Sequence, residues 1–323
     1  MATPNTAQAT LPLTQKSSGH KLWIQIKRHI PLYIMALPGL IYLFINNYMP
    51  MGGLTIAFKN INYRDGIWAS PWCGLDNFEF MFKTKDAITM ITNTISYNLV
   101  FIILNTFLSL MLAIFLNEVG HKFFKSFFQS ALLLPHLIST VVIAYLAYAF
   151  LSPSTGVINK SILEPLGIDG IDWYMTPKYW PFILIFVNAW KNVGYNCIVY
   201  FASIVGIDKS LYEAAELDGA SRWQQIWKIT VPIIMPTIMI MTLMSIGRIF
   251  RSDFGLFYQL PMNSGPLIDI TQTLDTYVYR ALLERGDIGM SSAAGFVQSI
   301  VGFVLVVISN NLAKRKDADG SLF

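Results

Sequence analysis

The chain has 323 residues, of which 54% are hydrophobic and 13% are charged, and its formal net charge is +4. Soluble domains contain roughly 45–50% apolar and about 25% charged residues, so this composition, with a mean hydropathy of +0.49, is typical of an integral membrane protein. The small positive charge does not indicate nucleic-acid binding. The two cysteines, Cys73 and Cys197, imply no disulfide framework.

Residues 1–29 form a polar segment that ends in a basic run. We expect a cytoplasmic tail whose last part, His20 to His29, lies along the membrane as an interfacial helix. No small-residue cleavage site follows the apolar stretch, so a cleaved signal peptide is not expected.

Six later segments are apolar and long enough to cross a bilayer, which takes about 20 residues each. They lie near 30–49, 94–117, 127–150, 180–204, 233–251 and 291–312. The fold class that follows is an all-α integral membrane protein, with a six-helix transmembrane domain over residues 30–312 and a C-terminal tail over 313–323.

The distribution of lysine and arginine predicts the orientation of these spans. With both ends inside, the inner segments hold twelve Lys and Arg residues and the outer loops hold eight. The short basic clusters Lys122/Lys125 and Lys314–Lys316 agree with this N-in/C-in arrangement. It places the polar interval between the fourth and fifth spans, residues 208–232, in the cytoplasm.

That interval has the pattern of two short helices joined by a sharp turn. Ser210 followed by Glu213 fits a capping box, and Ser221 followed by Gln224 fits a second one. Gly219 lies between them, where a left-handed helix stop is favoured. We therefore predict a helical hairpin on the membrane surface.

The same interval resembles the EAA loop of ABC importer permeases. Its match is Glu213-Ala214-Ala215, three residues, Gly219, nine residues and Ile229-Thr230-Val231-Pro232, and only Val231 departs from the I-x-L-P ending of the family pattern. The resemblance implies a type I ABC importer permease fold in which loop 208–232 inserts into an ATPase subunit. The residues that this implies for coupling are Glu213, Ala214, Ala215, Asp218, Gly219 and Ala220. The alternative is a solvated hairpin in which Glu213 only closes its capping box.

Two outer segments extend the resemblance to the sugar permeases. Trp72 to Phe78 is similar to a W-x-G-L-x-N-F stretch that follows the first span in that family. Asp253 to Gln259, with an expected helix over 271–285, resembles the permeases for polysaccharide and complex-oligosaccharide uptake, and the permeases of bacterial alginate importers most of all. These loops serve either as packing elements or, at exposed tips such as Asn263 to Gly265, as contacts for an extracellular partner.

No enzyme motif is present in the sequence. It contains no phosphate-binding loop of the form G-x-x-x-x-G-K-[ST], no metal-ligand spacing among its four histidines, and no Ser/His/Asp set. We expect a transporter subunit that binds no cofactor itself, with ATP and Mg on partner subunits. The resemblance implies a second permease subunit, most simply in a heterodimer, two ATPase subunits and an extracytoplasmic solute-binding protein, all at the bacterial inner membrane.

Polar side chains within the spans are the candidates for a translocation pathway, because such groups are costly in lipid and face a cavity or the bundle interior. The candidates form a helical stripe in the fourth span and a pair of arginines near the end of the fifth: Asn188, Lys191, Asn192, Tyr195, Asn196, Arg248 and Arg251. Either they line the pathway of an acidic, uronate-like saccharide, or they pack between helices and snorkel to the surface. An ion-coupled secondary transporter is the alternative function. It predicts acidic residues at mid-span, and we find none in the six segments.

Overall fold

The computed structural model describes residues 29–62, 64–79, 81, 85–284 and 286–316. The interfacial helix expected over 20–29 lies almost entirely outside these residues. In the described part the chain is helical, apart from an isolated antiparallel bridge between Lys59 and Trp72. Five of these helices are long and apolar enough to cross a membrane, or six if one bent pair counts as a span. The chain divides into two units, Met1–Leu54 and Thr55–Phe323.

The first unit contains the first predicted span. Helix α2 covers Ile30–Leu43 and continues through a wider turn at Phe44–Tyr48. Pro38 lies inside α2 and does not end it, in agreement with the tolerance of proline in membrane helices. All side chains from 29 to 50 are exposed. Since most of them are apolar, this helix presents a surface suited to lipid or to another membrane helix.

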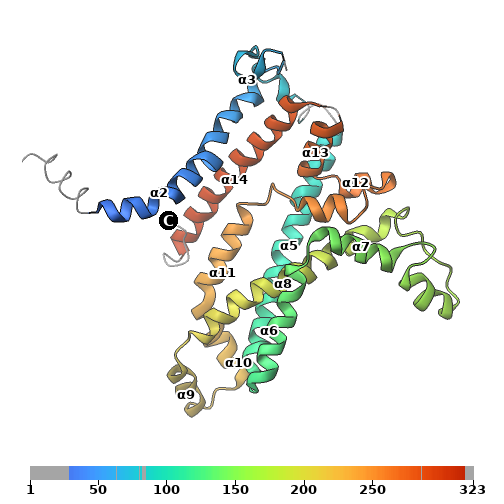
Figure 1. The fold of residues 1–323 in the computed structure, drawn as a ribbon. Coiled ribbons are helices and arrows are strands. Elements are labelled where there is room, and N and C mark those ends of the chain that lie inside the picture. The colour runs from blue at the N-terminus through green and yellow to red at the C-terminus, as the bar shows by residue number, and fades with distance from the viewer. Residues whose placement is uncertain (1–28, 63, 80, 82–84, 285, 317–323) are drawn as a thin grey trace, which may run out of the picture. The chain divides into compact units, whose positions relative to one another are not determined.

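The second unit is built around two long helices, α5 (Lys85–Glu118) and α8 (Trp180–Val205), which run alongside each other (Figure 1). Ser109 of α5 donates to the backbone oxygen of Val193 at 3.0 Å. On the other side of α8, an ideal Cβ at Gly194 would lie 1.8 Å from the backbone oxygen of Leu132 in α6. Only glycine permits this close approach of two helix backbones.

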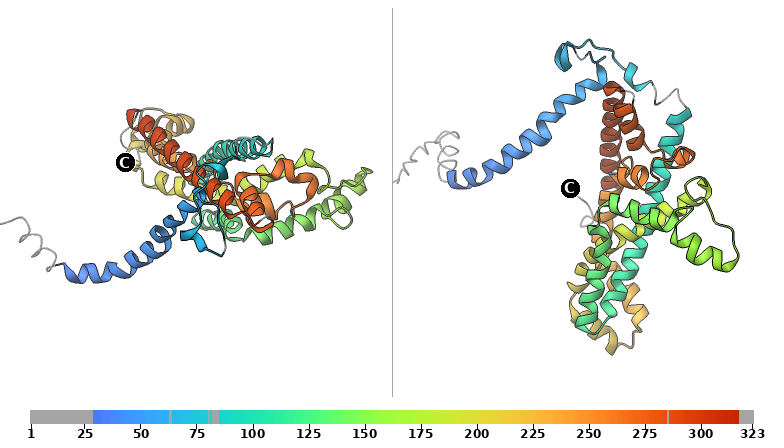
Figure 2. Two further views of the ribbon diagram at one scale, coloured as in Figure 1. Left: turned by 90° about the horizontal axis from the view of Figure 1, so that it is seen from above. Right: turned by 45° about the vertical axis from the view of Figure 1, so that its right-hand side comes forward.

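The third predicted span, 127–150, is wrong as a continuous helix. The structure has α6 (Lys122–Leu137) and α7 (Thr140–Leu151), bent by 94° at the break (Figure 2). Pro135 lies in the last turn of α6, and Ser139 caps α7 by accepting from the Val142 N–H at 3.4 Å. The proline weakens the helix and the serine starts a new one, so the chain turns between them.

The fifth span ends earlier than predicted. Helix α11 covers Val231–Ile246, so Arg248 and Arg251 lie in the turn beyond it and not within the span. The last helix, α14 (Ile288–Lys316), packs against α11 and begins and ends a few residues outside the predicted 291–312. The helix expected over 271–285 is α13 (Leu274–Glu284), preceded by the short α12 (Ile268–Thr271).

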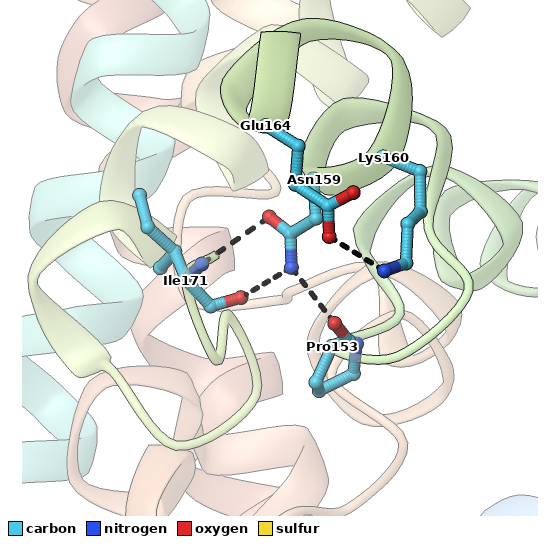
Figure 3. A network of polar contacts seen from close by, with 5 residues as sticks. All are labelled: Pro153, Asn159, Lys160, Glu164 and Ile171. Atoms are coloured by element: carbon cyan, nitrogen blue, oxygen red, sulfur yellow. Dashed lines mark hydrogen bonds and ion pairs between the residues drawn. The ribbon is translucent and has the colours of Figure 1, made fainter. Parts of the chain in front are cut away.

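The segment after α7 is held closed by one buried asparagine, Asn159, which is 2% exposed (Figure 3). Its Nδ2 donates to the backbone oxygens of Pro153 (3.1 Å) and Ile171 (2.9 Å), and its Oδ1 accepts from Trp173 Nε1 at 2.9 Å. Lys160 and Glu164 form an exposed ion pair at 2.5 Å beside it. The Asn159 side chain thus forms hydrogen bonds with the backbone at both ends of the loop, near Pro153 and near Ile171. These bonds hold the loop together without a disulfide.

The Trp72–Phe78 stretch has a packing role in the structure. Asn77 Nδ2 donates to the backbone oxygens of Ala57 (3.0 Å) and Lys59 (2.9 Å), while Phe78 is buried. The buried Lys59 ammonium donates in turn to the backbone oxygens of Ile67 (3.1 Å) and Trp68 (2.8 Å). Both cysteines are free, as the sequence predicts.

Candidate functional site

The EAA loop, residues 208–232, begins with helix α9 (Lys209–Leu217). Its cap is Asp208, whose carboxylate accepts from the Ser210 N–H at 3.0 Å, so the predicted Ser210–Glu213 capping box is wrong. This backbone hydrogen bond holds the pKa of Asp208 below its usual value. The cap therefore stabilises α9 at neutral pH, and the stabilisation is lost as the pH falls through that lowered pKa. Asp208 takes the cap because the chain is extended there, whereas Ser210 already lies inside the helix.

The turn after α9 has the geometry that the sequence predicts. Gly219 has φ of +79°. Its N–H donates to the backbone oxygen of Glu216 at 3.0 Å, and the Ala220 N–H donates to that of Ala215 at 2.9 Å. These two bonds are the pair that defines a Schellman motif. Gly219 thus permits a reversal that other residues adopt only with strain.

The second arm of the loop consists of α10 (Arg222–Gln225) and a wider helical turn at Ile226–Thr230. The predicted capping box is confirmed: the Gln224 N–H donates to Ser221 Oγ at 3.4 Å, and the Ser221 N–H donates to Gln224 Oε1 at 2.8 Å. Two contacts tie this arm to the first. The Tyr212 hydroxyl hydrogen-bonds the Thr230 hydroxyl at 2.8 Å, and Arg222 pairs with Glu216 at 3.1 Å.

The outer face of α9 is uncovered in this chain. Glu213, Ala214, Asp218 and Gly219 are exposed, whereas Ala215 and Ala220 are half-buried. Leu217 is 90% exposed at the tip. A hydrophobic side chain held at the end of a rigid hairpin, next to small residues, has the form of a contact surface for another protein. The sequence pattern alone did not single out Leu217.

A central cavity of about 180 Å³ lies between α5, α8 and the end of α11. It brings together four of the predicted pathway residues, Asn188, Asn196, Arg248 and Arg251. The rest of its wall consists of Asn98, Phe101, Ile102, Asn105, Thr106, Tyr200, Met241 and Ser245.

The two arginines are positioned by amides from other helices. Asn98 of α5 donates through Nδ2 to the backbone oxygens of Ile249 (2.9 Å) and Arg251 (3.0 Å). Gln298 of α14 donates to the backbone oxygen of Phe250 at 2.9 Å. The turn that carries the arginines is therefore held by hydrogen bonds from α5 and α14, although it lies outside a helix. In the described part of the chain neither guanidinium forms an ion pair, and both side chains are exposed.

A pair of amides forms the deeper wall of the cavity. Asn105 Nδ2 donates to Asn188 Oδ1 at 2.9 Å. The Asn105 Oδ1 atom is buried and has no hydrogen-bond partner among the described residues. An acceptor of this kind favours a donor group such as a hydroxyl. Asn98 and Asn105 were not among the predicted pathway residues, although their spacing of seven residues in an apolar helix was a usable signal.

The rest of the predicted stripe faces another part of the protein. The Lys191 ammonium donates to Thr140 Oγ1 at the start of α7 and lies 3.8 Å from Asp253 Oδ2. Tyr195 stacks on His136 with ring centroids 4.8 Å apart, and Asn192 donates to the backbone of its own helix. None of the three lines the central cavity. Lys191 thus has an acidic partner, Asp253.

Lys191→Met is therefore expected to affect stability more than transport. The change leaves Asp253, whose side chain is 39% exposed, without its cation, which costs about 1 kcal/mol for a pair of this exposure. Thermal unfolding of the purified complex should show a lower midpoint, with saccharide uptake reduced less than in Arg248→Met. A larger loss of uptake in Lys191→Met, at unchanged stability, contradicts this assignment.

Comparisons with known proteins agree with this architecture. Residues 105–317 match the model of the family described as binding-protein-dependent transport system inner membrane component. Protein LplB of Bacillus subtilis (strain 168) is 31% identical over 96% of each chain. The polygalacturonan/rhamnogalacturonan transport system permease protein YteP of the same organism is 32% identical over 98% of this chain and 99% of its own.

Solved structures show the same fold. A subunit in the crystal structure of a bacterial ABC transporter involved in the import of the acidic polysaccharide alginate is 36% identical, with a TM-score of 0.83 over 91% of this chain and 99% of its own. A chain of the bacterial alginate ABC transporter in complex with its alginate pentasaccharide-bound periplasmic protein is 35% identical, with a TM-score of 0.82 over 91% and 98%.

These matches cover most of the chain and therefore establish its family. They exclude the alternative of an ion-coupled secondary transporter. They also agree with the all-helical architecture. The chain belongs to the binding-protein-dependent transport system inner membrane components, and it is a multi-pass permease subunit of an ABC carbohydrate importer.

Proposed function

We propose that this permease transports an acidic, uronate-containing oligo- or polysaccharide through the central cavity. The observation that carries the proposal is the pair Arg248 and Arg251. Two guanidinium groups lie on one cavity wall, and no carboxylate of the described chain pairs with them. Carboxylates bind guanidinium groups strongly and in a defined geometry, so a uronate chain supplies the missing partners.

The remaining wall suits the neutral part of such a substrate. The unpartnered Oδ1 of Asn105 accepts from a sugar hydroxyl, and Asn196 and Ser245 add further hydrogen-bonding groups to the wall. Two of the similar proteins are named for acidic or galacturonan polysaccharides, which supports the same substrate class. The proposed pathway residues are therefore Asn188, Asn196, Arg248 and Arg251, with Lys191, Asn192 and Tyr195 bracing the helices behind them.

The energy for transport comes, in this proposal, from partner subunits. The EAA loop lies on the cytoplasmic side, where Glu213, Ala214, Ala215, Asp218, Gly219 and Ala220 contact an ATPase subunit. A second permease subunit completes the pathway, two ATPase subunits hold ATP and Mg, and a solute-binding protein delivers the saccharide from outside. Closure of the ATPase pair moves the loop and shifts the permease between inward-facing and outward-facing states.

Uptake into vesicles that contain the complete complex tests this proposal. We expect ATP-dependent uptake of a uronate oligomer when the solute-binding protein is present, and much slower uptake of a neutral oligomer of equal length. Equal or faster transport of the neutral oligomer contradicts the assignment of an acidic substrate.

Replacements of Glu213 test its role separately. Because Asp208 and not Ser210–Glu213 caps α9, removal of the Glu213 carboxylate leaves the helix cap intact. We therefore expect Glu213→Gln and Glu213→Ala to weaken co-purification of the ATPase subunit to the same extent, with α9 retained. If only Glu213→Ala loses the ATPase, the residue acts through helix stability and not through its charge.

A further inference from the structure

A second cavity, of about 320 Å³, lies in the angle between the EAA loop and the neighbouring ends of α5, α6 and α8. Both arms of the loop contribute to its wall, including Tyr212 and Thr230, whose hydroxyls are joined at 2.8 Å. It is distinct from the central cavity, and no residue lines both. Any ligand held here contacts the loop and the span ends together.

The wall of this loop cavity is positively charged. It contains Lys125, Lys209 and Arg222 against one carboxylate, Glu118. Arg222 is already paired with Glu216 at 3.1 Å, where both side chains are at least half exposed. Lys125 donates to the backbone oxygen of Asn117 at 3.4 Å. In the described part of the chain neither lysine forms an ion pair, so two ammonium groups are available to an anion.

The lysine from α6 is held in place by its surroundings. Its ammonium lies 5.1 Å from the ring centroid of Phe201, which is buried in α8, and the Lys125 side chain is only partly exposed. A cation on an aromatic face in a partly desolvated site attracts an anion more strongly than a freely mobile surface lysine does. Lys125 is therefore more ordered than an ordinary surface lysine, whereas Lys209 is exposed.

The position of the cavity at the ends of the membrane spans indicates that it lies near the membrane surface. Two candidate spans end at Glu118 and Val205 and a third begins at Arg222, and all three residues are in its wall. Next to it, Trp223 and Trp227 are 68% and 53% exposed and stack edge-on with centroids 5.7 Å apart. Tryptophan is enriched at the boundary between hydrocarbon and water. The cavity thus lies at the depth of lipid headgroups.

We propose that the loop cavity binds the phosphate of an anionic phospholipid of the inner leaflet, through Lys125 and Lys209. The cytoplasmic position of the loop rests on the proposed function. A lipid fits better than a soluble phosphate ester because the three span ends and the tryptophan pair surround the cavity with apolar surface, which suits the glycerol and acyl part of a lipid. The bound lipid links both arms of the loop to α5 and α6.

Association of spin-labelled lipids with the complete reconstituted complex tests this site. We expect the wild-type complex to prefer spin-labelled phosphatidylglycerol over spin-labelled phosphatidylcholine. The preference should fall by about fivefold for each of Lys125→Gln and Lys209→Gln, the attraction expected between one lysine and an anionic surface. Lys228→Gln is the matched control, since this exposed lysine lies in the same loop but outside the cavity wall, and it should retain the preference.

Three results overturn the proposal. The first is an unchanged preference in the Lys125→Gln/Lys209→Gln variant. The second is displacement of the labelled lipid by soluble glycerol phosphate at equal concentration, which makes a soluble phosphate ester the ligand. The third is loss of the ATPase subunit without loss of the lipid preference, which assigns the lysines to a protein partner. Because the assay uses neither saccharide nor ATP, its failure is separate from a failure of the proposed substrate.

Discussion

Replacement of Gly219 by proline is expected to reduce saccharide uptake by about two orders of magnitude, the effect that a displacement of about 1 Å can have on a positioned group. Proline fixes φ near −65°, whereas Gly219 has φ of +79°. The change also removes the N–H that donates to the Glu216 backbone oxygen at 3.0 Å. The turn between the two arms must then reorganise, and the surface around Ala215 and Leu217 is displaced. Uptake and ATP hydrolysis measured in parallel should show hydrolysis that saccharide no longer stimulates.

Gly219→Asn is the control for this variant, because asparagine adopts left-handed backbone angles at small cost. An ideal Cβ at Gly219 has no neighbour within 4 Å, so the added side chain meets no obstacle. We expect uptake close to that of the wild type. Normal uptake and normal stimulation in Gly219→Pro contradict a coupling role for the EAA loop. A bulky residue at the half-buried Ala215 should uncouple the complex in the same way.

The second large effect is expected for the cavity arginines. A hydrogen bond to a charged group contributes about 1.5–3 kcal/mol, so Arg248→Met and Arg251→Met should each slow uronate uptake tenfold or more. Both arginines are exposed to the cavity and form no ion pair within the described chain, so their replacement leaves no buried acid unpaired. The assembled complex should therefore be recovered in normal yield.

Arg280→Met is the matched control for the arginines. Arg280 also lies beyond α11, but its guanidinium donates to Asn263 Oδ1 at 3.0 Å and it does not line the central cavity. Uronate uptake should change little in this variant. Similar losses in all three variants indicate a general effect of arginine removal and contradict a direct role of Arg248 and Arg251.

Features set by local sequence were predicted well. The Gly219 turn and the Ser221–Gln224 capping box depend on residues within five positions of one another, and both are present. Five of the six predicted spans are continuous helices in the described part of the chain, and these follow from apolar length alone. The cap of α9 was missed because Asp and Ser are both favourable N-cap residues. Whether Asp208 or Ser210 takes this position depends on where α8 ends and the chain becomes extended.

Features set by neighbouring helices were not predictable from one sequence. The bend between α6 and α7 was missed because both halves are apolar, and Pro135 alone does not distinguish a kinked span from a broken one. Successive residues of α8 are rotated by about 100° around the helix axis. The polar residues of α8 therefore spread over a wide face of the helix, and two neighbouring helices, α5 and α7, contact different parts of that face. Asn188 faces α5, whereas Lys191 faces the start of α7. The residue spacing predicts which face of α8 is polar, but only the packing of the neighbouring helices determines which of these residues line the cavity.

The most direct test of the account combines a change in the protein with a change in the substrate. Uptake of a uronate oligomer and of its methyl ester, which has equal length and no charge, is measured in the wild type and in the Arg248→Met/Arg251→Met variant. We predict that uptake of the uronate by the variant falls about a hundredfold or more, because two charge-assisted contacts are lost, whereas uptake of the ester changes little. Equal losses with both substrates contradict recognition of the substrate carboxylates by the central cavity.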